Sequence, residues 1–107
     1  MKNIKLKNEK LTKVDAVIDI INDMELKDKL RLGVCMSTSS YTNLLYNKNE
    51  LNKLFDNKLK EIDEEYRTSY VNMSKYKIVM IVMAKIMEMD EEEQNQVVMY
   101  LNNNINI

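Results

Sequence analysis

The feature that most restricts the fold of this chain is its near lack of turn-forming residues. The 107 residues include no proline and a single glycine, Gly33. Compact β-sheet folds need tight turns, and those turns draw on Gly and Pro for backbone angles that other residues adopt poorly. A sheet protein with many turns is therefore implausible, and we expect an all-α fold.

Length and composition indicate one globular domain. The chain is 45% hydrophobic and 31% charged, which is typical of a folded domain of the commonest size. We expect a single helical domain over residues 1–107, with residues 1–11 as a flexible basic arm. The lone Cys35 cannot form an internal disulfide, which favours the cytoplasm. The longest apolar run covers residues 78–84, far short of the ~20 residues of a membrane span, so no membrane contact is expected.

Apolar residues recur at three- and four-residue spacing, which predicts a compact bundle of about five helices. The first stripe follows Thr12, a good N-cap residue, and loses its apolar face near residues 22–23. Its members are Val14, Val17, Ile18, Ile21 and Met24. A short second helix with Leu26 and Leu30 inward should end at Gly33, because glycine readily adopts the left-handed conformation that closes helices.

The longest apolar pattern starts near Asn49 and keeps a helical seam for nearly 40 residues. It begins with Leu51, Leu54, Phe55, Leu59, Ile62 and Tyr66. We expect a break between Thr68 and Ser74, because Thr, Ser and Asn are poor interior helix residues. Residues 75–89 are apolar on nearly every face, which predicts the central helix of the bundle. A buried strand over residues 78–82 is the alternative.

The last helix has the clearest start signal in the chain. Asp90 is a good N-cap, and three glutamates follow it in the first turn, where the helix dipole favours anions. The inward stripe of this helix is Val97, Val98, Leu101 and Ile105.

The residue types argue against an enzyme. Without histidine the usual general base near neutral pH is missing, and one glycine cannot form a phosphate-binding loop. The acidic residues 61–65 are best interpreted as a solvated helix face, and residues 90–93 as a helix cap. We therefore expect no catalytic residue, no cofactor, no metal site and no small-molecule substrate.

Methionine and tyrosine give the first functional indication. The chain has nine methionines and six tyrosines, too many tyrosines for the interior of a small bundle. Methionine suits adaptable protein contacts, although simple core filling is the alternative. The candidate residues for partner binding or self-association are Tyr66, Tyr70, Met73, Tyr76, Met80, Met83 and Met87.

A second indication points to DNA. Residues 32–38, Leu-Gly-Val-Cys-Met-Ser-Thr, resemble the turn of helix-turn-helix regulators, although Lys29 and Ser39 stand where that motif has a small and an aliphatic residue. The resemblance implies a recognition helix over residues 37–46. Phosphate contacts would come from Lys27, Lys29 and Arg31, and base contacts from Ser37, Thr38, Ser40, Tyr41 and Asn43. A helix end followed by a polar loop is the alternative.

Charge and composition are both unevenly distributed in this chain. Residues 1–60 carry a net charge of +4 and residues 61–107 a net charge of −5. Asn, Lys and Ile are abundant and have AT-rich codons, which indicates an AT-rich genome. Our leading hypothesis is a non-enzymatic regulatory protein that binds another protein or itself through its helices, such as a phage or mobile-element inhibitor or adaptor. The alternative is a helix-turn-helix DNA-binding regulator with a C-terminal dimerisation region.

Overall fold

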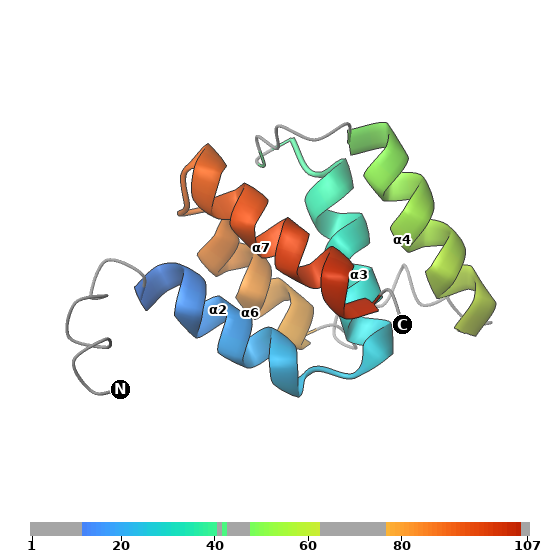
Figure 1. Ribbon diagram of the computed structural model, residues 1–107, viewed down its shortest axis with the longest axis horizontal. Helices are drawn as coiled ribbons and strands as arrows, with labels where there is room; N and C mark the ends of the chain where they lie inside the picture. The colour runs from blue at the N-terminus through green and yellow to red at the C-terminus, as the bar shows by residue number, and fades with distance from the viewer. Residues whose placement is uncertain (1–11, 41, 43–47, 63–76, 106–107) are drawn as a thin grey trace.

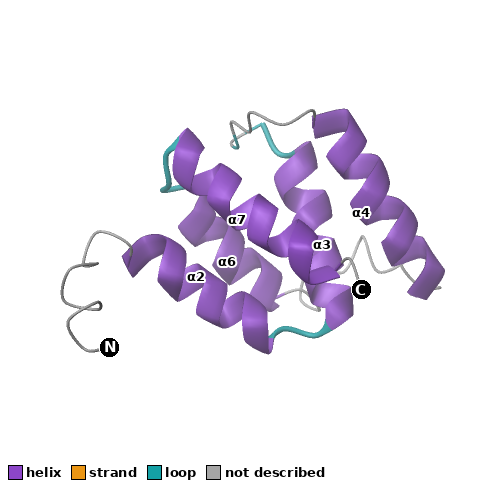
Figure 2. Cartoon of the chain, viewed as in Figure 1, coloured by secondary structure: helices purple, strands orange, loops and turns teal. Residues whose placement is uncertain are grey.

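The computed structural model describes residues 12–40, 42, 48–62 and 77–105, and these residues form an all-helical bundle (Figure 1). In chain order the helices are α2 (Thr12–Asp23), α3 (Leu26–Thr38), α4 (Lys48–Ile62), α6 (Lys77–Ile86) and α7 (Glu91–Ile105). Helices and short loops account for the whole described part, with no strand (Figure 2). The predicted all-α bundle of about five helices is confirmed, and residues 78–82 are helical. None of the described helices has both the length and the apolar character to cross a lipid bilayer.

Helix α2 follows its sequence pattern closely. Val14, Val17 and Ile21 are buried, and Met24 is buried just beyond the helix end at Asp23. The predicted end near residues 22–23 is therefore confirmed. The predictions of a basic arm over residues 1–11 and of a break between residues 68 and 74 lie outside the described residues.

Helix α3 differs from the prediction, because it continues through Gly33 to Thr38. Gly33 has no positive φ and does not close the helix. The hydroxyls of Ser37 and Thr38 donate hydrogen bonds, each of 2.8 Å, to the carbonyls of Gly33 and Val34. These polar side chains are satisfied inside the helix, so the polar run that was predicted to be a loop extends α3 by more than a turn.

The glycine instead allows a close approach between α3 and α4. A Cβ atom at position 33 would lie 2.4 Å from the ring of Phe55, which is fully buried on α4. Real Cβ atoms essentially never approach another heavy atom this closely. The only glycine and the only phenylalanine of the chain thus form one fitted contact at the α3–α4 interface.

Helix α3 also takes the central position that the sequence assigned to residues 75–89. It packs against α4, α6 and α7, and it buries Leu30, Leu32, Val34 and Met36, although Leu26 is exposed and not inward as predicted. Helix α6 buries one side only, through Val79, Val82 and Ile86. In Figure 1 the helix α4 lies beside α3, away from α2 and α6.

Hydrogen bonds close the C-terminal end of α3 and join it to α4. The buried hydroxyl of Thr42 donates to the carbonyl oxygens of Met36 and Ser39. The ammonium group of Lys48, the first residue of α4, donates to the carbonyls of Ser39 (2.9 Å) and Thr42. A cation in this position also interacts favourably with the negative end of the α3 dipole.

The α6–α7 turn is fixed by a reciprocal cap. The carboxylate of Asp90 accepts a hydrogen bond from the backbone N–H of Glu93 (2.8 Å), and the Glu93 carboxylate accepts one from the N–H of Asp90 (3.0 Å). The predicted Asp90 cap is confirmed, and the bond from Glu93 completes it as a capping box. The buried amide of Gln94 donates to the carbonyl of Ile86 (3.1 Å), the last residue of α6. The predicted inward stripe of α7 is confirmed, because all four of its residues are buried.

Candidate functional site

Three large exposed apolar side chains cluster on one side of α6 and the turn that follows it. Met80 is 49% exposed, Ile81 52% and Met87 45%, and Ala84 between them is exposed as well. Residues three and four apart share one side of a helix, so Met80, Ile81 and Ala84 are neighbours. A backbone hydrogen bond from Met87 to the carbonyl of Met83 (2.9 Å) carries the helical path on to Met87. We call these four residues the α6 surface.

Charged residues border the α6 surface at both ends. Lys77 precedes it by one turn, Lys85 lies beside Ala84, and Glu88 follows Met87; all three side chains are exposed. Lys77 is the first residue of α6 and Glu88 lies in the turn just past its end, where its backbone N–H bonds to the carbonyl of Lys85 (3.2 Å), so the two charges stand at opposite ends of the α6 surface. An apolar centre between charged ends is the usual anatomy of a protein contact.

The structure brings together only part of the predicted contact set. Met80 and Met87 lie on the α6 surface, whereas Met83 is half-buried and packs against the core. The other four candidates, Tyr66, Tyr70, Met73 and Tyr76, lie outside the described residues. Sequence reasoning missed Ile81 and Ala84. Ala84 is four residues after Met80 and three before Met87, and Ile81 is three residues before Ala84, so helical spacing would have placed both on the same side.

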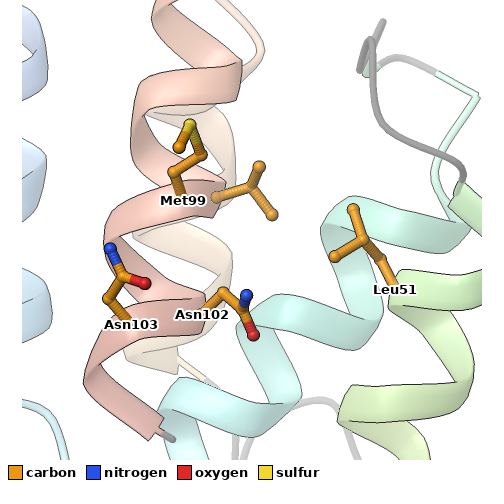
Figure 3. Close-up of a pocket in the computed structure, with 5 residues that line it drawn as sticks. Leu51, Met99, Asn102 and Asn103 are labelled. Carbon is orange, nitrogen blue, oxygen red and sulfur yellow. The ribbon is translucent and has the colours of Figure 1, made fainter.

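A small concave feature lies between α4 and α7. Figure 3 shows Leu51 of α4 facing Met99 and Asn102 of α7 across it, and its remaining lining residues are Val98 and Asn103. Its volume is about 170 Å³. Pockets that hold drug-sized molecules measure roughly 300–1,000 Å³. The lining contains no ionisable side chain, so this groove offers neither the volume nor the chemistry of an active site.

The geometry expected from the helix-turn-helix resemblance is wrong. The proposed turn is part of α3, and the Ser37 side chain, a predicted base contact, is buried. Arg31 forms an ion pair with Asp28 (2.8 Å), and Lys29 is half-buried. Lys27, Thr38 and Ser40 are exposed, whereas Tyr41 and Asn43 lie outside the described residues. The candidate DNA-contacting residues thus do not form one exposed face.

The described residues contain no evident reactive group. No three acidic or cysteine side chains among them are close enough to hold a metal ion. Cys35 is half-buried in α3, and burial raises the pKa of its thiol, which lowers the fraction of reactive thiolate. Glu61, from the acidic run, is exposed at the end of α4.

Comparisons with protein-family models, with characterised proteins and with solved structures find no match. Single exposed apolar residues are common on protein surfaces, whereas adjacent large ones mark contact sites. Leu26, Leu54, Ile62 and Met99 are exposed on other helices, but only α6 exposes two large apolar side chains in successive positions among the described residues. The α6 surface is the best candidate for a functional site.

Proposed function

We propose that this protein is a non-enzymatic regulatory binding protein that acts by helix-mediated contact through the α6 surface. The observation that carries the proposal is the exposure of Met80 and Ile81, about half of each side chain, on one turn of a helix. Covering these side chains removes apolar area from water, at roughly 25 cal/mol per Å². Methionine adapts its shape to a partner at little conformational cost, which suits a protein contact.

The DNA-binding alternative has weaker support. Its turn is absent from α3, and a buried Ser37 cannot reach a base. The net charge of +4 over residues 1–60 remains its supporting feature.

Affinity capture with α6 variants tests the proposal. We expect Ile81→Asp to weaken partner binding at least about tenfold, because a carboxylate at the centre of an apolar contact loses its hydration. The matched control is Leu54→Asp, which places the same charge at an exposed apolar position of α4. The measurement is capture from cells that express the protein, with nuclease present to remove bridging DNA, after thermal melts have shown that both variants fold.

The expected result is a protein partner that is retained by the wild type and by Leu54→Asp and lost by Ile81→Asp. A partner retained equally by all three chains would place the contact elsewhere and contradict the proposal. Capture that disappears with nuclease in every chain would favour the DNA-binding alternative.

A further inference from the structure

The exposed charged and apolar residues along α6 are arranged so that two copies of this helix would complement each other if they ran antiparallel. Read from the N-terminal end, the exposed positions are Lys77, the pair Met80 and Ile81, then Ala84 and Lys85, and finally Met87 and Glu88. A base stands at one end and an acid at the other, both exposed, with the bulky and the small apolar residue between them. Two such helices that run in opposite directions place each base beside an acid.

This register also matches the apolar side chains in size. If Lys77 of one helix lies opposite Glu88 of a second copy, then Ile81 lies opposite Ala84 of that copy, and the reverse pairs follow by symmetry. A large side chain facing a small one lets the two helices approach closely and interdigitate. Met80 then faces the aliphatic stem of Lys85, which can cover it while the ammonium group stays in water.

Helix dipoles favour the same arrangement. Glu88 stands just past the end of α6, where the partial negative charge of the helix terminus disfavours a carboxylate. In the antiparallel pair this position receives the ammonium group of Lys77 from the second copy. A parallel pair in register would instead bring two copies of Lys77 together, and two copies of Glu88.

We infer that the occupant of the α6 surface is a second copy of this chain, paired through antiparallel α6 helices about a two-fold axis near residues 82–83. The inference rests on the proposed function, since it names the partner of the same surface. A two-fold pair uses one patch twice, so each favourable contact occurs two times. Its small apolar centre is typical of a weak, reversible dimer.

Charge reversal in purified protein tests the pairing. We expect Lys77→Glu and Glu88→Lys each to weaken dimerisation about tenfold, because each variant creates two like-charge pairs per dimer. The double variant Lys77→Glu/Glu88→Lys should recover the wild-type affinity, since it restores both pairs with opposite signs. Lys53→Glu, an exposed reversal on α4, is the control and should leave dimerisation unchanged. The measurement is sedimentation equilibrium over a concentration series.

Cysteine cross-linking in a Cys35→Ala background tests the direction. A mixture of Lys77→Cys and Glu88→Cys chains should form a disulfide-linked heterodimer on mild oxidation with copper–phenanthroline. Lys77→Cys alone should not, because its two thiols would lie about 16 Å apart along the antiparallel axis, beyond disulfide reach. Efficient cross-linking of Lys77→Cys with itself would mean a parallel pair and overturn the inference.

A wild-type chain that stays monomeric throughout the series also overturns the inference, as does a dimer that neither single charge reversal affects. The proposed function is tested by a different result, the capture of protein partners by the wild type and by Ile81→Asp. If the pure protein is monomeric but an unrelated protein is captured through Ile81, the binding surface is right and the second copy is wrong. If captured partners ignore Ile81→Asp, the surface itself is wrong.

Discussion

Among single residues, Gly33 is closely constrained in the core by its contact with Phe55. We expect Gly33→Ala to destabilise the protein by about 1–2 kcal/mol. A Cβ atom 2.4 Å from the Phe55 ring forces α3 and α4 apart or moves the ring, and such overpacking typically costs ~1–3 kcal/mol. Alanine offsets this by up to ~1 kcal/mol through its higher helix propensity. Urea unfolding of both chains measures the difference.

The double variant Gly33→Ala/Phe55→Leu is the control for this contact. The smaller, more flexible leucine leaves room for the added methyl group. The double variant should therefore lose less free energy of unfolding than the two single variants lose together. A Gly33→Ala chain as stable as the wild type would show that the ring moves aside freely.

Gly33 also shows where residue-level prediction from sequence reaches its limit. Glycine is typical both of a helix end and of a close approach between helices, and the second role depends on a residue 22 positions away, Phe55. The serine and threonine that follow Gly33 predict a polar loop. Their hydroxyls bond back to α3 carbonyls, which makes them compatible with a helix that is held by packing on both sides.

At the scale of single helices, the start of α7 is determined by capping residues that are close together in the sequence. We expect Asp90→Ala to cost about 1 kcal/mol, because the Glu93 N–H loses its capping acceptor. Glu92→Ala, an exposed change in the same first turn, should cost only a few tenths of a kcal/mol through the helix dipole. Thermal or urea unfolding distinguishes the two. Equal effects would mean that charge near the terminus, and not the specific hydrogen bond, stabilises α7.

The contrast between α6 and α7 explains which parts of the site could be predicted. The cap and the stripe of α7 follow from residues next to each other in sequence. Whether α6 is enclosed depends on how many helices surround it, and periodicity carries no such information. The sequence therefore placed Met80 and Met87 in a candidate contact, and it missed that Ile81 is exposed at the centre of that contact.

At the scale of the molecule, the helices differ in how firmly they are held. Helix α4 packs extensively only against α3, whereas α3 is packed by three helices and α7 by both α2 and α3. We expect α4 to open first, as a unit, while the rest stays folded. Native-state hydrogen exchange in low urea should show protection free energies in α4 about 1–3 kcal/mol below those of the slowest amides in α3.

Two core variants separate this partial opening from global unfolding. Phe55 leaves the core when α4 opens, so Phe55→Leu should lower protection in α4 and in α3 by a similar amount. Val97 of α7 stays buried in that partly open state, so Val97→Ala should lower the protection free energies in α3 and α7 but not those in α4. This difference should hold until the protection free energies in α3 have fallen to those in α4. If both variants lower protection in α3 and α4 alike, the bundle unfolds in one step, and the single interface of α4 is as strong as the several interfaces of α3. The fitted Gly33–Phe55 contact would then account for that strength.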